Sequence, residues 1–212
     1  ERGNAIVFLA SILDALQNST DCRVVSMQGG DKHNAIPREA FATVLISPEA
    51  MADAQIIVSK REQGLNKEFG SKEKNLKINF AGLDDSPEKT LTEKSQTALV
   101  GLLRTIPHGV LKYSHDVEGL VETSNNLAAV RCDGGNYIII SSTRSSISDA
   151  LESQRERIAI MSKVYGAKVE QDEAYPGWAP NLDSSILEIT TKIYSEMLGG
   201  EPNVCAIHAG LE

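Results

Sequence analysis

The chain has 212 residues, of which 41% are hydrophobic and 24% are charged, and its formal net charge at pH 7 is −8. These proportions are ordinary for a globular protein, and no apolar run approaches the ~20 residues that a membrane span requires. A pI near 5.1 argues against a nucleic-acid partner, because binding a phosphate backbone relies on clustered Lys and Arg. We therefore expect neither a membrane nor a nucleic acid as a partner.

The cysteines and histidines are spaced without any pattern that predicts a metal site. The three cysteines lie far apart with no C-x-x-C pair, and the four histidines form neither an H-E-x-x-H motif nor a pair at helical spacing. An odd cysteine count without a secretory leader favours a reducing compartment, so we expect a cytoplasmic protein. The chain lacks an initiator Met and stops just after an apolar run, and we interpret it as a segment of a longer protein.

The first half of the chain predicts a unit of order α-β-β-α-β over residues 4–81. The expected elements are helices that start at Asn4 and Ser47 and strands at residues 22–27, 40–46 and 76–80. Asn4 can cap a helix whose apolar residues recur at i, i+3, i+4 and i+7, and Ser47-Pro48 is typical of a helix start. The strands are indicated by alternating or continuous apolar residues.

The second half predicts a similar order over residues 92–175, although few residue identities repeat. The expected elements are a helix from Thr92 to Ile106, strands at residues 119–124, 127–132, 136–142 and 167–170, and a helix from Ser146 to Gly166. Asp133-Gly134-Gly135 is a hairpin signal, and Ser146 with Asp149 fits a capping box.

A helix and a last strand at residues 204–207 are expected within residues 183–208, with Ser185 and Glu188 as a second capping box. The order of elements indicates an α/β (α+β) fold. We expect a two-layer sandwich in which a mostly antiparallel sheet carries helices on one face and contains two α-β-β-α-β units.

Three polar side chains stand where predicted strands end: Asn34, Arg144 and His208. Asn34 offers amide donors and an acceptor in a turn that begins with two glycines. Arg144 can clamp a carboxylate through two parallel hydrogen bonds, and His208 can donate to a developing oxyanion. Each residue also has a structural interpretation: a turn that bonds its own backbone for Asn34, a surface ion pair for Arg144, and a fixed polar side chain for His208.

The sequence predicts no nucleophilic triad. The serine-rich run 141–148 lacks a G-x-S-x-G context, and the spacing gives no support to a Cys-His dyad. An independent hydrolase that uses Ser or Cys therefore has no supporting motif, and we expect no catalytic residue and no metal ligand in the chain itself.

Five short motifs resemble, in their order, those of one family. They are Arg2-Gly3-Asn4-Ala5, Gly29-Gly30 followed by Asn34-Ala35-Ile36-Pro37-Arg38-Glu39-Ala40, Arg144-Ser145-Ser146, Tyr175-Pro176-Gly177-Trp178, and Ile207-His208-Ala209-Gly210-Leu211-Glu212. Over its whole length the chain resembles the aminoacyl-histidine dipeptidases (Xaa-His dipeptidase, peptidase D, cytosol non-specific dipeptidase), which are zinc exopeptidases related to carnosinase and dipeptidase V. One departure is His33, where we expect a basic residue.

The resemblance implies one part of an enzyme. Family members have a catalytic domain that binds two divalent metals, which we expect to be zinc, and a lid domain inserted into it. Residues 1–212 are similar to that lid, entered after Arg2-Gly3 and left near Gly210, and they lack the family's metal-ligand motifs. The lid is expected to orient Xaa-His and other dipeptides over the metal centre. Asn34 and Arg144 match lid positions that hold the substrate's terminal carboxylate or backbone, and the match of His208 is weaker.

The partners that the resemblance implies are a dipeptide substrate, the chain's own catalytic domain and a second copy. Lids of relatives mediate homodimers, while in some relatives a doubled lid takes the partner's place, and we favour the homodimer. The alternative interpretation is a free-standing α/β domain that senses an amino acid. A longer natural reading frame would exclude that alternative.

Overall fold

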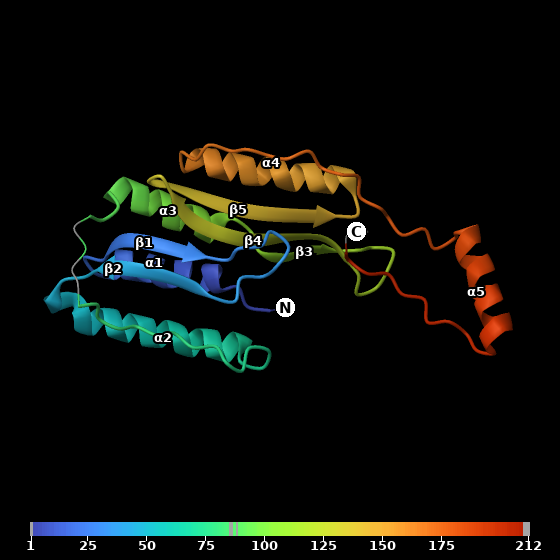
Figure 1. The fold of residues 1–212 in the computed structure, drawn as a ribbon, viewed down its shortest axis with the longest axis horizontal. Coiled ribbons are helices and arrows are strands. Elements are labelled where there is room, and N and C mark those ends of the chain that lie inside the picture. Colours follow the sequence, from blue (N-terminus) through green and yellow to red (C-terminus); the bar gives the residue numbers. More distant parts are fainter. Residues whose placement is uncertain (1, 85–86, 88, 210–212) are drawn as a thin grey trace.

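The structure is a computed structural model that describes residues 2–84, 87 and 89–209. The helices are α1 (Ala5–Ser19), α2 (Met51–Phe69), α3 (Glu93–Thr105), α4 (Ser148–Val164) and α5 (Ser185–Leu198), with a short 3-10 helix η1 (Pro48–Ala50) before α2. The strands are β1 (Arg23–Gly29), β2 (Ala40–Leu45), β3 (Gly109–Tyr113), β4 (Val121–Asp133) and β5 (Asn136–Ser145). Figure 1 shows one sheet lined by α1 to α4, while α5 stands away from both.

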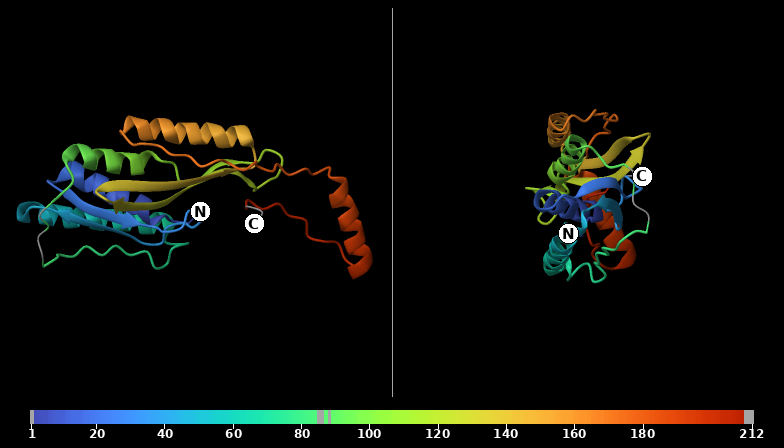
Figure 2. Two further views of the ribbon diagram at one scale, coloured as in Figure 1. Left: turned by 45° about the horizontal axis from the view of Figure 1, so that its top comes forward. Right: turned by 90° about the vertical axis from the view of Figure 1, so that its left-hand side faces the viewer.

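All strand pairings are antiparallel, and β4 is the central strand. One edge of β4 pairs with β5 along most of its length, and the other edge pairs with β3 at one end and with β1 at Val130. β2 pairs with the far edge of β1. The helices lie side by side on one face in the order α2, α1, α3, α4 (Figure 2). The predicted two-layer sandwich, with its antiparallel sheet and helices on one face, is confirmed.

Several element ends form as the local sequence predicts. The Asn4 side chain caps α1 by accepting hydrogen bonds from the amides of Ile6 (2.9 Å) and Val7 (3.3 Å). Ser47 caps η1, and Thr92 caps α3 by accepting from the Ser95 amide. Between β4 and β5, Gly134 and Gly135 have φ angles of 55° and 84°, which suit a two-residue hairpin turn.

Other predicted elements are wrong. Residues 76–80, 167–170 and 204–207 are irregular backbone, so each half lacks its predicted last strand. Residues 119–124 and 127–132 contribute to the single strand β4, and β3 was not predicted. The two capping boxes are absent, because α4 and α5 start after Ile147 and Ser184 without a side-chain cap.

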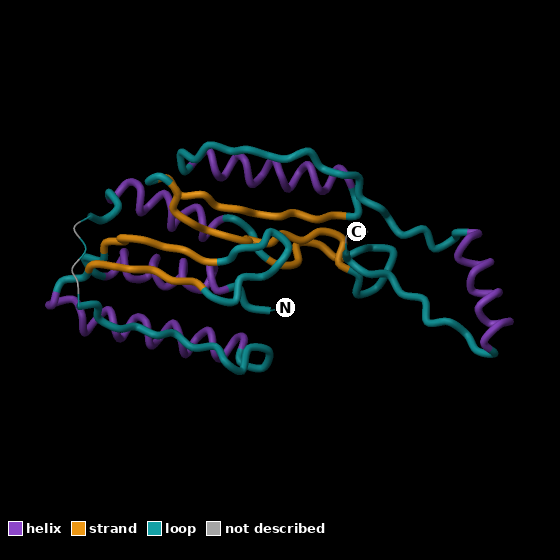
Figure 3. Tube along the Cα trace, in the orientation of Figure 1, coloured by secondary structure: helices purple, strands orange, loops and turns teal. Residues whose placement is uncertain are grey.

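Two of the missing strands are replaced by segments that contact helices. Residues 76–80 run beside α2 (Figure 3), where Ile78 and Phe80 pack and the Ile78 amide donates to the Glu62 carboxylate at 2.9 Å. After α4, Arg155 donates to the carbonyl of Asp172 and accepts at its own carbonyl from Gln171. In the first segment a helix side chain supplies a polar partner that a neighbouring strand would otherwise provide, and in the second the bonds to Arg155 lie just beyond residues 167–170.

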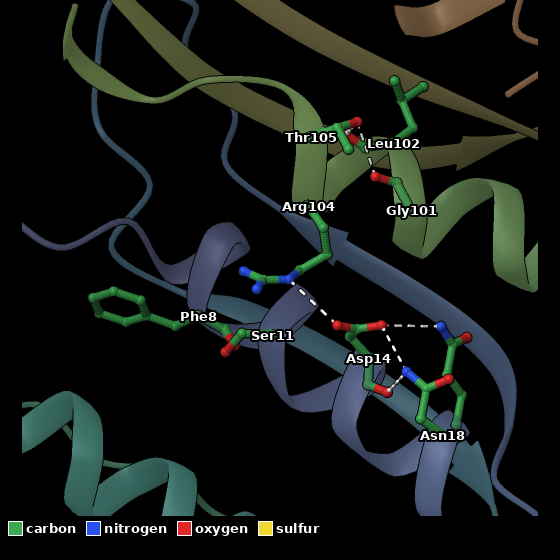
Figure 4. A network of polar contacts seen from close by, with 9 residues as sticks. Phe8, Ser11, Asp14, Asn18, Gly101, Leu102, Arg104 and Thr105 are labelled. Atoms are coloured by element: carbon green, nitrogen blue, oxygen red, sulfur yellow. Dashed lines mark hydrogen bonds and ion pairs between the residues drawn. The ribbon is translucent and has the colours of Figure 1, made fainter. Parts of the chain in front are cut away.

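The main core lies between the sheet and the helix layer. Its fully buried side chains include Ile6, Leu13, Met27, Leu103, Leu127 and Val130. On the helix layer, Arg104 of α3 pairs with Asp14 of α1, with 3.6 Å between Nε and Oδ2 (Figure 4). Among the described residues, no helix is long and apolar enough to cross a membrane.

Side chains connect β1 to the rest of the molecule where β1 separates from β4. β1 pairs with β4 only at Gly29 and Val130 in the described sheet. Farther along β1, the Tyr137 hydroxyl accepts from the Met27 amide at 3.1 Å, and Gln96 accepts from the Val24 amide at 2.7 Å. Side chains thus satisfy the amides of Val24 and Met27, and the backbone amide of Leu91 donates to the Val24 carbonyl at 2.7 Å.

A buried carboxylate ties the start of the chain to the turn between β1 and β2. Glu73 accepts hydrogen bonds from the Gly3 amide at 3.1 Å and from two nitrogens of Arg38. The hydrogen bonds from Arg38 are the main cause that lowers the pKa of Glu73 to about 2, against its ordinary 4.5.

This pKa predicts an acid-sensitive contribution to stability. A carboxyl whose pKa is lower in the folded state stabilises the fold above its unfolded pKa, and that stabilisation is lost as the pH falls from 4.5 towards 2. Glu73→Gln is therefore expected to lower the free energy of unfolding near pH 7, with a deficit that shrinks below pH 4.5. Urea unfolding at several pH values measures it, with Glu170→Gln in the exposed Lys168 pair as the control. A deficit that stays constant from pH 7 to pH 3 would contradict the assignment.

Candidate functional site

The candidate site lies on the sheet face opposite the helices, at the end of the sheet where Ser145 ends β5. Alternation along β4 directs Asn125 to the helix side, where it is buried, and directs Ser124 and Asn126 to the opposite side. The Asn125 amide donates to the carbonyl of Pro107 at 2.6 Å, and its oxygen accepts from the hydroxyls of Ser141 and Thr143. These bonds fix the backbone from which the site is built.

Arg144 and His208 meet at this corner. Arg144 lies opposite Ser124 in the register of β4 and β5, so the two side chains share a face. The His208 ring, which follows α5 in the sequence, places Nε2 2.8 Å from the Ser124 hydroxyl. Burial is the main cause that lowers the pKa of His208, and the positive charge of Arg144 lowers it further. His208 is therefore mostly neutral near pH 7.

Arg144 has an unusual set of neighbours for a cation. Among the residues that the structure describes, no carboxylate lies within ion-pair distance of its guanidinium. Its titratable neighbour is instead the ring of His208, which is mostly neutral near pH 7. A guanidinium in this setting is suited to an acidic group supplied from outside, because its planar fork matches a carboxylate.

The turn that contains Asn34 is fastened to the same face. The Asn126 amide donates to the carbonyls of His33 (3.2 Å) and Ala35 (2.7 Å), which flank Asn34 on both sides. Gly30 allows the close approach, since its φ is 67° and a Cβ there would lie 2.0 Å from the Ala128 carbonyl oxygen. The Asn34 side chain itself is exposed.

The three residues predicted from the sequence thus come to one region of the sheet. Ser124 and Asn126 are successive residues on one face of β4, which spaces them about 7 Å apart. One holds His208 and faces Arg144, and the other holds the turn of Asn34. Their roles in binding stay predictions.

Sequence reasoning missed Ser124 and Asn126 as the residues that position this site. The pair Asn125-Asn126 was interpreted as a break between two strands, whereas both residues lie inside β4. The available signal was a run of polar residues followed directly by the apolar run 127–130, which is typical of a strand that leaves the core and enters a polar site.

Within the described residues, no three His, Cys, Asp or Glu side chains are grouped so that they could hold a metal ion. Cys132 and Cys205 are exposed, and burial raises the pKa of the Cys22 thiol to about 11, which disfavours its reactive thiolate. The arrangement at Arg144 is suited to binding and orienting a small acidic molecule.

Comparison with known proteins identifies relatives of the whole chain. Residues 1–73 match the family model described as the peptidase dimerisation domain. The cytosol non-specific dipeptidase of Escherichia coli (strain K12) is 33% identical over 210 residues, which cover 99% of this chain and 43% of that protein. The crystal structure of aminoacylhistidine dipeptidase from Vibrio alginolyticus matches with a TM-score of 0.90 and 31% identity, over 99% of this chain and 42% of that chain.

The chain therefore spans less than half the length of the two relatives. The match to both extends over nearly all of it. Of the motifs that suggested the resemblance, Gly210, Leu211 and Glu212 lie outside the residues that the structure describes. The resemblance predicted from the sequence is confirmed: the chain is similar to a segment of the aminoacyl-histidine dipeptidases, and its residues 1–73 match the peptidase dimerisation domain.

Proposed function

We propose that this chain is the lid of a zinc-dependent dipeptidase that hydrolyses Xaa-His and other dipeptides, and that it orients the substrate over a metal centre carried by the rest of a longer protein. The observation that carries the proposal is Arg144, a cation on an open sheet face without a described acidic partner. The named relatives are dipeptidases, and every dipeptide ends in a carboxylate that a guanidinium can clamp.

In this proposal the lid residues divide the work of positioning. Arg144 binds the terminal carboxylate, and the exposed Asn34 amide bonds the peptide backbone. His208 is the third contact, and Ser124 fixes its ring at the same corner. Two divalent metals outside this chain supply the activated water when they are bound. The chain's own residues hold the dipeptide in one orientation and exclude bulk water as the lid closes.

We also propose that the protein forms a homodimer and is cytoplasmic. The dimerisation-domain match supports self-association and covers α1, β1, β2 and α2. Within this region β2 is an edge strand with exposed Phe41 and Leu45, which is the kind of edge that pairs with another chain. The location is supported by the name of the E. coli relative.

The 212-residue chain alone is expected to be inactive. Because the proposal puts the metal ligands and the general base outside it, the purified chain should bind no stoichiometric zinc and should not cleave dipeptides such as Ala-His or Gly-Gly. Elemental analysis and a hydrolysis assay measure both properties, with the full-length protein as the positive control. One tightly bound zinc per chain, or turnover by the chain alone, would overturn the lid assignment.

A further inference from the structure

Residues 178–207 form an arm that leaves the body of the molecule (Figures 1 and 2). Its helix α5 contains no buried residue. Six large apolar side chains of α5 are exposed by 44–76%: Ile186, Ile189, Ile193, Tyr194, Met197 and Leu198. On either side of the helix, Trp178, Val204 and Ile207 are exposed as well.

Four of the exposed apolar residues of α5 share one side of the helix. Ile186, Ile189, Ile193 and Met197 follow the i, i+3, i+7, i+11 spacing of a single stripe, and the opposite side carries Thr191 and Ser195. A stripe of this kind forms when one side of a helix packs against something apolar. Contiguous exposed apolar surface of this extent marks an interaction site.

Both ends of the arm are fixed at the candidate site. At the outgoing end Gly177 passes against the end of β5, where a Cβ would lie 2.6 Å from the Ser145 carbonyl oxygen. At the returning end His208 contacts Ser124 of β4. Ser145 and Ser124 belong to adjacent rungs of the same strand pair, with Arg144 opposite Ser124. The arm therefore starts and ends beside Arg144.

We propose that residues 178–207 are a docking arm, which packs the apolar side of α5 onto the part of the longer polypeptide that lies outside this chain and so holds that part over Arg144 and His208. The inference rests on the proposed function, because it takes the chain to be part of a longer dipeptidase. Under this proposal the lid ends at about residue 177. The helix and the strand expected within residues 183–208 then pack with the rest of the longer protein.

Three observations favour the rest of the longer polypeptide, and not a second copy of the chain, as the partner of α5. The solved relative matches 99% of this chain, which includes the arm, and more than half of that relative lies outside the match. Both ends of the described chain lie at the end of the sheet that faces the arm (Figures 1 and 2), so polypeptide beyond either end would begin near the arm. The dimerisation-domain match covers residues 1–73, which contain no part of the arm.

Hydrogen exchange of the α5 amides tests the proposal. In the 212-residue chain these amides are expected to exchange almost without protection, and in the full-length protein at least about a hundredfold more slowly, because packing there stabilises the helix. Ile189→Glu with Ile193→Glu is expected to abolish this protection in the full-length protein. The matched control, Thr191→Glu with Ser195→Glu, adds the same charge at the same spacing on the polar side and should preserve it.

Two results would overturn the docking arm. One is equal exchange of α5 in the short and full-length proteins. The other is a dimer of the 212-residue chain, seen by light scattering, that the Ile189 and Ile193 variant dissociates, because the second copy would then be the occupant. These measurements involve no substrate. A failure at Arg144 would therefore refute the proposed binding role and leave the docking arm in place.

Discussion

Arg144→Lys in the full-length protein is expected to lower kcat/KM for dipeptides roughly ten- to a hundredfold without changing the metal content. An ammonium carries the same charge but cannot reproduce the planar two-bond clamp on a carboxylate. The loss of such a charge-assisted bond costs about 1.5–3 kcal/mol, which corresponds to that range of rates. Steady-state kinetics and elemental analysis of the same preparation measure the two properties.

Arg131→Lys is the matched control. Arg131 lies in the same strand pair, opposite Ile138 and beyond the candidate site, and its side chain is exposed. This variant should keep kcat/KM within about twofold of the parent, since exposed arginines contribute little through ion pairs. If Arg144→Lys left kcat/KM unchanged, Arg144 would be a surface cation without a role in substrate binding.

The features that the sequence predicted correctly depend on near neighbours in the chain. Asn4 and Thr92 cap helices through bonds to amides two or three residues away, and Gly134-Gly135 closes a hairpin whose strands follow directly. The two-layer arrangement is also accessible, because α1 to α4 each carry an apolar side that needs a sheet to cover it. Such features need no knowledge of distant contacts.

The features that were missed depend on distant contacts. A short apolar run such as 76–80 predicts a strand only if an edge is available, and here the Ile78 amide bonds to Glu62 of α2 instead. Residues 204–207 have an apolar strand pattern, yet no described strand pairs with them. If the arm docks on the rest of the protein, that strand acquires its neighbour there.

The sequence predicted which residues belong to the candidate site but not how the fold brings them together. Asn34, Arg144 and His208 were selected because each follows a predicted strand and because the family motifs contain them. What brings them together is the register of β4 with β5 and the bonds made by Ser124 and Asn126. The register of two paired strands depends on contacts between residues far apart in the chain, and one sequence alone does not predict it.

Gln96→Leu is expected to destabilise the fold by about 2–6 kcal/mol, because it removes the side-chain partner of the Val24 amide in β1 and of the Cys22 carbonyl just before β1. Gln96 is 4% exposed, accepts from the Val24 amide at 2.7 Å and donates to the Cys22 carbonyl at 3.0 Å. Leu fills a similar volume but offers no polar atom, and each buried group left unsatisfied costs about 1–3 kcal/mol. Denaturant unfolding that shows a lower midpoint with an unchanged m-value would measure this loss.

Gln17→Leu is the control for this prediction. Gln17 accepts the third bond of Gln96, at 3.3 Å, so its loss leaves the bonds to β1 intact and should cost less than about 1 kcal/mol. If both variants lost equal stability, the effect would come from the contact between α1 and α3 and not from β1. A larger loss in Gln96→Leu would mean that, where β1 has moved away from β4, a glutamine on α3 takes the place of the missing strand.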